Sequence, residues 1–323
     1  MTRTILCPVD FSTASRGAVQ YAAALARHFG SGLVILTVTD PLLAEAAAMQ
    51  SSDARVVDDT RAELERFTAS AIERPHPSVR VTYEVATGQP APEILRVAKA
   101  RRSELIVISS HGLSGFRKMF FGSTTERVLR ETTVPVLIVP GGGPGPSSLE
   151  EAAAHVRRVL VPVLFPPSSG QPLAVARAVS DALGVPALLL HVVEPLRALS
   201  PRADALVPGI ERERRARAEA ELARVTAGQG PSAEALIAYG EPSEEIVKVA
   251  RDRHAGLIVM GLQGSSLSGP RIGSVTYRVL CAAPCPVLAL PPDAAGGARG
   301  KSRSARKNTE AGSGLEGGDR GKH

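Results

Sequence analysis

Short, nearly continuous apolar runs alternate along this chain with longer stretches in which apolar residues recur at helical spacing. In the N-terminal half, the apolar runs predict strands at residues 3–9, 33–39, 79–85, 104–110 and 135–139. The segments between them predict helices near residues 13–29, 55–73, 90–102 and 123–131. Runs of Val, Ile and Leu without polar alternation are typical of strands buried on both faces. Because parallel strands need right-handed crossover helices, this order predicts a doubly wound, five-stranded parallel α/β sheet.

The whole pattern occurs twice. "TILCPVDFS", "VATGQPAPEIL", "SELIVISSHG" and "VPVLIVP" reappear in the same order as "RVLVPVLFPPS", "IAYGEPSEEIV", "AGLIVMGLQG" and "CPVLALP", and corresponding glycines and prolines lie 151 to 154 residues apart. A constant offset over several blocks indicates a tandem duplication. We therefore expect an N-terminal repeat at residues 1–140, a linker at 141–155 and a C-terminal repeat at 156–292. Residues 293–323, a basic Gly/Ser-rich tail without apolar periodicity, are expected to be disordered.

Composition narrows the function classes. The chain has 323 residues and a net charge of +6. The tail carries seven basic and four acidic residues, so its net charge of +3 is half of the total. Together with the scarcity of aromatic residues, this makes a nucleic-acid reader an unfavoured interpretation. No apolar run reaches the length of a membrane span, so no membrane partner is expected. The three cysteines lack the spacing of a disulfide framework or zinc site, which favours buried thiols and a cytoplasmic location.

Two strand ends carry the candidate chemistry. Asp10 follows the first strand and Ser109 follows the fourth, and in a doubly wound sheet these ends flank the switch point where ligands bind. Ser109 opens "SSHGLSGFRKMFFGSTTE", which ends in Ser123-Thr124-Thr125-Glu126. That last pattern predicts a capping box. A glycine before a helix start equally suits a phosphate cradle, since free N–H groups and the helix dipole favour anions. Both interpretations stay open on the residues alone.

Other conspicuous residues have structural interpretations. His191, within "LLLHVVEP", is expected to be a hydrogen-bonded histidine at a strand end, and Asp40 and Glu194 are expected to be turn residues. The charged run 211–225 has the spacing of a solvated helix face with ion pairs. No serine–histidine–acid set, paired carboxylates or metal cluster has motif support, so no catalytic or metal-ligating residue is expected.

Together, the duplicated "CPVDFS", "GQPAPEIL", "SSHG" with nine residues before "GS", and "VPVLIVP" resemble the universal stress protein (UspA-like) family, over nearly all of residues 1–140 and 156–292. The resemblance implies two tandem Rossmann-like domains that pair as a pseudo-dimer through their final strands. It also implies ATP, AMP or ADP as ligand, with or without Mg²⁺. By this resemblance Asp10 would hold the ribose. The remaining implied contacts surround the adenine, ribose and phosphates: Pro8, Val38, Ile108, Ser109, His111, Gly112, Gly122, Ser123 and Thr124.

The two repeats depart differently from the family pattern. Ser109 stands where the pattern has its first glycine, and Leu164 stands in the C-terminal repeat where Asp10 stands in the first. An apolar residue cannot accept a hydrogen bond from a ribose hydroxyl, and leaving a buried polar group unpaired costs about 1–3 kcal/mol. The C-terminal repeat is therefore expected to hold a second, weaker site, formed by Pro162, Val192, Gly261, Gly264, Gly273 and Ser274.

The favoured function is a stress-response regulator that binds an adenine nucleotide in the N-terminal repeat and hydrolyses it slowly at most. One alternative is a slow ATPase or nucleotidyl-transfer enzyme using Asp10 and His111 around Mg²⁺. Another is a protein-interaction module without nucleotide. A homodimer and an unidentified protein partner fit each of these.

Overall fold

The computed structural model describes residues 3–49, 53–72, 79–110, 122–141, 151, 156–165, 170–196, 207–230, 232–262 and 272–292. The N-terminal repeat contains β1 (Thr4–Pro8), α1 (Thr13–Phe29), β2 (Gly32–Thr39), α2 (Pro41–Ala48), α3 (Asp53–Ala71), β3 (Val81–Thr87), α4 (Pro90–Ala100), β4 (Leu105–Ser109), α5 (Ser123–Glu131) and β5 (Val136–Val139). The C-terminal repeat contains β6 (Val159–Pro162), α7 (Gln171–Leu183), β7 (Ala187–Val193), α9 (Val207–Ala227), β8 (Glu234–Tyr239), α10 (Pro242–Asp252), β9 (Leu257–Gly261), α11 (Ser274–Ala282) and β10 (Val287–Leu290).

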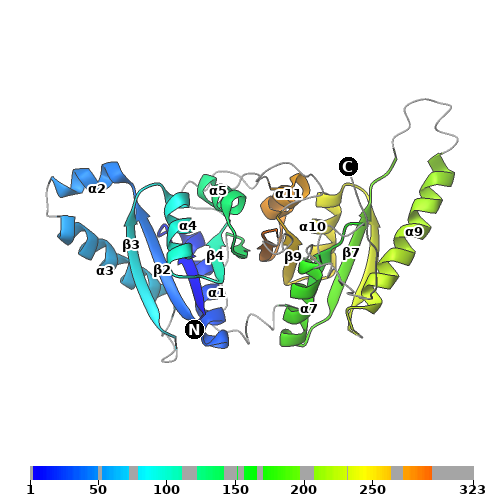
Figure 1. Ribbon diagram of the computed structural model, residues 1–323, viewed down its shortest axis with the longest axis horizontal. Coiled ribbons are helices and arrows are strands. Elements are labelled where there is room, and N and C mark those ends of the chain that lie inside the picture. Colours follow the sequence, from blue (N-terminus) through cyan, green and yellow to red (C-terminus); the bar gives the residue numbers. More distant parts are fainter. Residues whose placement is uncertain are drawn as a thin grey trace, which may run out of the picture. The chain divides into compact units, whose positions relative to one another are not determined.

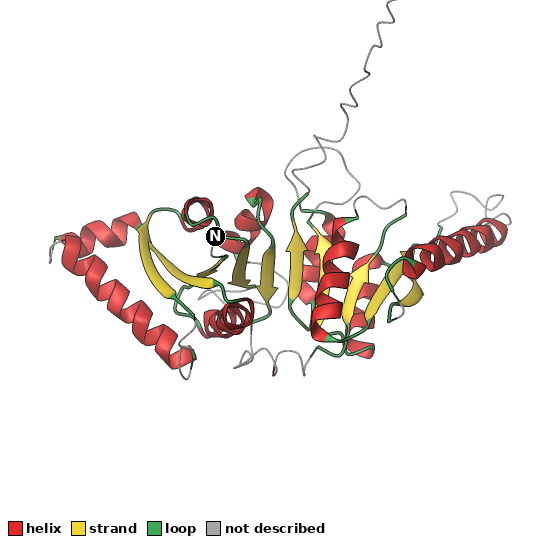
Figure 2. Cartoon of the chain, turned by 60° about the horizontal axis from the view of Figure 1, so that its bottom comes forward, coloured by secondary structure: helices red, strands yellow, loops and turns green. Residues whose placement is uncertain are grey.

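The strands form one ten-stranded sheet in the order β3-β2-β1-β4-β5-β10-β9-β6-β7-β8 (Figures 1 and 2). Each repeat contributes five parallel strands in the same internal order, with its first strand between its second and fourth. The repeats join through β5 and β10, which pair antiparallel with Leu137 opposite Leu288. The predicted α/β fold and the predicted contact through the final strands are therefore confirmed.

Both faces of the sheet are covered, because alternate residues of each strand point to opposite faces. On β1, Ile5 and Cys7 enter the apolar cluster under α1 and α3, while Leu6 enters the cluster under α4 and α5. The second of these clusters continues across β5 and β10 into the C-terminal repeat, where it includes Val287. This burial on both faces explains why the strand segments of the sequence are apolar almost without interruption.

One helix was not predicted. The helix α2 begins at Pro41, whereas Asp40, expected as a turn residue, lies directly before it and accepts from the Leu42 amide through Oδ1 at 2.8 Å. Proline suits the first helical position because its missing N–H would have no intrahelical partner there. The helix shows no apolar periodicity to reveal it, and its Leu42 side chain is 76% exposed.

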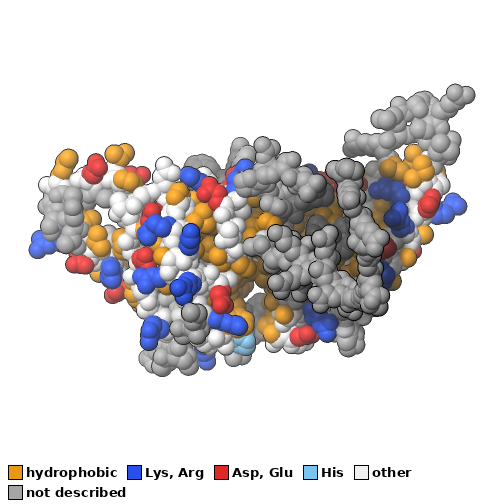
Figure 3. Space-filling view, viewed as in Figure 1, with side chains coloured by type: hydrophobic (Ala, Val, Ile, Leu, Met, Phe, Trp, Pro, Cys, Tyr) orange, Lys and Arg blue, Asp and Glu red, His pale blue; other side chains and the backbone are white. Residues whose placement is uncertain are grey.

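The solvated face predicted for residues 211–225 is confirmed on α9. Ion pairs join Arg224 to Glu221 at 2.8 Å and Arg215 to Glu219 at 3.7 Å, and all four side chains are exposed. On the N-terminal repeat, basic and acidic side chains are likewise interspersed over the face that carries α4 (Figure 3). The tail, residues 293–323, and most of the predicted linker lie outside the described residues.

Candidate functional site

A cavity of about 310 Å³ opens at the carboxyl ends of β1, β2 and β4, beside the starts of α4 and α5. This is the switch point, since β1 pairs with both β2 and β4. Eight residues singled out from the sequence line it: Pro8, Asp10, Val38, Ile108, Ser109, Gly122, Ser123 and Thr124. His111 and Gly112, which belong to the same sequence motif, lie outside the described residues.

Sequence reasoning missed five lining residues, namely Val9, Leu36, Pro90, Ile94 and Thr125. Leu36 could have been found, because it lies two positions before Val38 on β2 and therefore on the same face of the strand. Pro90 and Ile94 belong to α4, and no local pattern tells which helix covers this end of the sheet. With them, the apolar wall consists of parts of β1, β2, β4 and α4.

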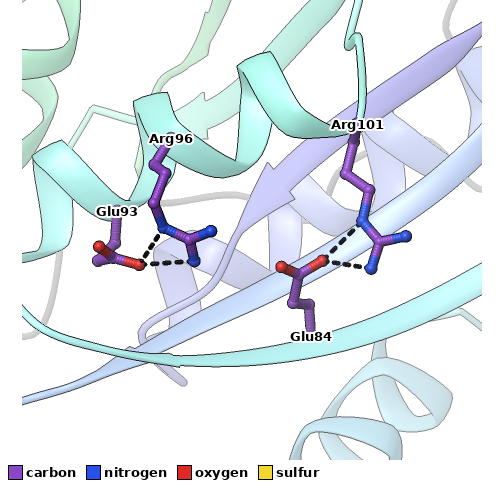
Figure 4. Close-up of polar contacts among 4 residues, drawn as sticks. All are labelled: Glu84, Glu93, Arg96 and Arg101. Atoms are coloured by element: carbon purple, nitrogen blue, oxygen red, sulfur yellow. Dashed lines mark hydrogen bonds and ion pairs between the residues drawn. The ribbon is translucent and has the colours of Figure 1, made fainter.

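Charged contacts lie along the outer side of α4 and at its end (Figure 4). Arg101 Nη2 lies 2.8 Å from Glu84 Oε2 on β3, and Arg96 Nη2 lies 2.8 Å from Glu93 Oε2 within the helix. Arg127 on α5 also donates to Gln89 Oε1, directly before α4, at 2.9 Å. Arg101 and Arg127 thus join the two ends of α4 to β3 and α5. Its buried residues Ala91, Ile94 and Val97 share an apolar cluster with Leu36 of β2, and its first turn forms the side of the cavity.

Asp10 sits in a compact hydrogen-bond network at the start of α1. Its Oδ1 accepts from the Ser12 amide at 3.1 Å, from the Ser12 hydroxyl at 2.6 Å, and from the Ser15 hydroxyl. Ser12 is also the N-cap of α1, accepting from the Ser15 amide at 3.2 Å. Between them Phe11 adopts a positive φ of 61°, a conformation that is uncommon for residues other than glycine. The network thus fixes both the turn and the carboxylate that lines the cavity.

The predicted capping box at α5 is wrong. The N-cap is Gly122 rather than Ser123, no side chain caps it, and Glu126 pairs with Arg130 instead of reaching back. The Thr125 hydroxyl donates to the Ser109 carbonyl at 3.1 Å, and this hydrogen bond ties α5 to the end of β4. The helix start beside the cavity therefore has no side-chain cap among the described residues, and its dipole favours an anion there.

Gly122 is not required by backbone conformation. Its φ of −60° and ψ of 135° are open to any residue. What glycine supplies at this position is the absence of a side chain between the helix start and the cavity. Such glycines occur where a backbone must come close to a ligand.

The C-terminal repeat has the same framework with a different residue at the position of Asp10. Pro162 ends β6, Val192 lies in β7, Gly261 ends β9, and Gly273 is the N-cap of α11 with Ser274 as the first helical residue. Thr276 donates to the Gly261 carbonyl at 3.0 Å, as Thr125 does to Ser109. Leu164, at the position of Asp10, is 51% exposed. Gly264 lies outside the described residues.

His191 and the cysteines have the structural roles expected for them. His191 Nδ1 lies 2.8 Å from the Val163 carbonyl, and its ring packs 4.6 Å from that of Phe165. Burial raises the pKa of the Cys7 thiol and raises that of Cys285 to about 12, so both thiols are protonated at neutral pH. Cys281 is half-buried. Within the described part of the chain, no group of three His, Cys, Asp or Glu residues could hold a metal ion.

Comparison with known proteins fits this picture of a duplicated fold. The model of the Universal stress protein family matches the chain twice, at residues 1–140 and 155–291. The chain belongs to the universal stress protein family.

Among curated universal stress proteins, YxiE of Bacillus subtilis is 30% identical over 147 residues, which is 43% of this chain and 99% of that protein. A Thermus aquaticus member is 36% identical over 119 residues, covering 36% of this chain and 84% of its own. A crystal structure of an Archaeoglobus fulgidus universal stress protein aligns over 90% of this chain and 98% of its own, with a TM-score of 0.61 and 21% identity. The single-domain relatives thus match one repeat, and the structural neighbour matches the tandem fold. No helix among the described residues is long and apolar enough to cross a membrane.

Proposed function

We propose that this universal stress protein is a stress-response regulator that binds ATP, or a related adenine nucleotide, in the cavity of its N-terminal repeat. Family membership supports the stress-response role. The observation that carries the nucleotide proposal is the arrangement of three chemically different walls around one cavity at the switch point of the sheet. An apolar wall, a carboxylate and a helix start without a side-chain cap match the three parts of a nucleotide.

Each wall suits one part of the ligand. Pro8, Val38 and Ile108 give an apolar surface for the flat face of a base. A carboxylate accepts hydrogen bonds from hydroxyl groups, so Asp10 would hold the ribose. At the start of α5, Gly122 leaves the first amides of the helix accessible to phosphate oxygens, where the dipole adds to the attraction. The cavity is at the small end of the range for sites that bind small molecules.

The same geometry favours binding over catalysis. Oδ1 of Asp10 already accepts three hydrogen bonds from Ser12 and Ser15, which holds the carboxylate in place as a hydrogen-bond acceptor. His111, the other residue of the enzyme alternative, lies outside the described residues. The bound nucleotide would act as the signal, because a ligand stabilises the folded state to which it binds, here that of the N-terminal repeat.

Calorimetry with ATP, with and without Mg²⁺, tests the proposal on the wild type and two pairs of variants. Asp10→Ala and Gly122→Val change the site, whereas Leu164→Ala and Gly273→Val make matched changes in the C-terminal repeat. Valine can adopt the φ and ψ of Gly122, so circular dichroism should show an intact fold.

Binding of one nucleotide per chain, lost in Asp10→Ala and Gly122→Val but kept in the two controls, is the expected result. If the wild type does not bind, the nucleotide proposal is wrong and the protein-interaction alternative gains weight. If the controls lose binding equally, the nucleotide binds elsewhere than in the N-terminal cavity.

A further inference from the structure

Ser12 and Ser15 are built around Asp10 more elaborately than helix capping requires. To cap α1, Ser12 needs only to accept the Ser15 amide, which it does at 3.2 Å. Its hydroxyl proton is instead directed to Asp10 Oδ1 at 2.6 Å, and the Ser15 hydroxyl donates to the same oxygen. Ser15 also accepts from the Asp10 amide at 3.3 Å, so it contacts both the backbone and the side chain of that residue.

Both hydroxyls are shielded from water. Ser12 is 7% exposed and Ser15 is 2% exposed, whereas Asp10 reaches the cavity wall. A buried hydroxyl aimed at a carboxylate has little freedom to turn elsewhere, because no water competes for it. The rotation of the Asp10 carboxylate is therefore set from behind by two serines that are not themselves among the residues lining the cavity.

The C-terminal repeat provides an internal comparison. Aligned on Pro8 and Pro162, its sequence has Leu164 at the position of Asp10 and Pro166 at that of Ser12. The acceptor and one of its two hydroxyl donors are thus replaced together, while the tether between the helix start and the fourth strand is kept as Thr276. Ser12 is therefore absent where the carboxylate is absent, and its capping role is not kept either, because α7 begins at Gln171 with Gly170 as its N-cap.

Resting on the nucleotide site proposed above, we infer that Ser12 and Ser15 are positioning residues that make the cavity selective for ribonucleotides over deoxyribonucleotides. A held carboxylate accepts a ribose hydroxyl without first losing rotational freedom, so the hydrogen bond contributes more to binding. When the hydroxyl is absent from the ligand, the carboxylate on the cavity wall loses that partner. Hydrogen bonds to charged groups make such discrimination about tenfold to a hundredfold.

The test compares ATP, 2′-deoxy-ATP and 3′-deoxy-ATP by calorimetry on the wild type, Ser15→Ala and Ser12→Gly. Glycine is used at position 12 because it is a tolerated N-cap, so the hydroxyl can be removed with little loss of helix capping. Ser180→Ala is the matched control, since Ser180 is a buried serine on α7, the counterpart of α1, and lies in the repeat without the carboxylate.

The wild type should prefer ATP over at least one deoxy analogue by about tenfold or more. In Ser15→Ala this preference should fall to about threefold or less, because the affinity for ATP drops while that for the poorer analogue hardly changes. Ser12→Gly should show a similar fall, since each variant removes one hydroxyl donor to Asp10 Oδ1 and keeps the amide of residue 12. Ser180→Ala should behave as the wild type.

The inference and the nucleotide proposal fail in different ways. If the wild type binds ATP but does not distinguish the deoxy analogues, or if both serine variants keep the wild-type preference, the inference is overturned and the nucleotide site stands. A loss of affinity that is equal for all three ligands would make the serines purely structural, which also overturns it. If the wild type binds none of the ligands, both the site and the inference are wrong.

Discussion

The tether between Thr125 and the end of β4 offers a quantitative test, because the fold contains it twice. Thr125 is 5% exposed and donates to the Ser109 carbonyl at 3.1 Å, while Thr276 is 5% exposed and donates to the Gly261 carbonyl at 3.0 Å. Valine has nearly the same shape as threonine and lacks the donor. Thr125→Val and Thr276→Val therefore make the same chemical change at corresponding places in the two repeats.

Thr125→Val leaves the carbonyl of the buried Ser109 without one of its partners, and Thr276→Val does the same to the half-buried Gly261. Such a loss costs about 1–3 kcal/mol. In a protein of this size, a loss of 1 kcal/mol lowers the thermal midpoint by about 2–4 °C, so each variant should unfold about 2–12 °C below the wild type. Differential scanning calorimetry measures this. Because the two threonines match in burial and in donor–acceptor distance, the two decreases should be similar.

The nucleotide affinity should separate the two variants. Ser123 and Thr124 line the cavity in the same helical turn as Thr125, so loosening the tether moves the start of α5 away from the phosphates. If the net hydrogen-bond energy of about 1 kcal/mol is lost from binding, the affinity for ATP falls about fivefold in Thr125→Val. It should not change in Thr276→Val. Equal weakening in both variants, or no loss of stability in either, would refute this reasoning.

Two further predictions concern stability. Gly88 has a φ of +150°, and an added Cβ would lie 3.0 Å from Glu93 Cγ. Gly88→Ala should therefore lower the free energy of unfolding in urea by about 1–3 kcal/mol. Gly30→Ala should lower it less, because a Cβ at Gly30 meets nothing within 4 Å, and equal losses would contradict the steric argument. Burial alone would raise the pKa of Glu241, but hydrogen bonds from Ser243 and the Glu244 amide and the charge of Arg278 lower it overall. A lowered folded-state pKa means that the ionised carboxylate stabilises the fold above its ordinary value of 4.5 and that this stabilisation is lost as the pH falls through the folded-state value. The stability difference between wild type and Glu241→Gln should therefore be largest at neutral pH and shrink below pH 4.5, and a difference that grows on acidification would contradict the assignment.

The sequence predicted those parts of the structure that depend on periodicity and topology. Strands and crossover helices follow from the spacing of apolar residues, and Asp10 and Ser109 could be placed together because parallel strands end at one edge of a sheet. The capping box failed because α5 starts one residue earlier than the motif implies: with Gly122 as N-cap, Glu126 falls one position beyond the place from which it could reach back. Pro90 and Ile94 were missed for a different reason, since their place in the cavity depends on how α4 packs against β2, which is a tertiary contact.

The duplication separates residues that build the scaffold from residues that serve a ligand. Features present in both repeats, such as the threonine tether and the positive φ of Gly88 and Gly240, belong to the fold, because they persist where Asp10 has been replaced by Leu164. Features present once are the stronger candidates for function, and Asp10 with Ser12 is the pair replaced together. A Leu164→Asp change alone would then restore the acceptor without the Ser12 donor that holds it. A second nucleotide site in the C-terminal repeat would require both residues, so the proposed nucleotide would act through the N-terminal repeat.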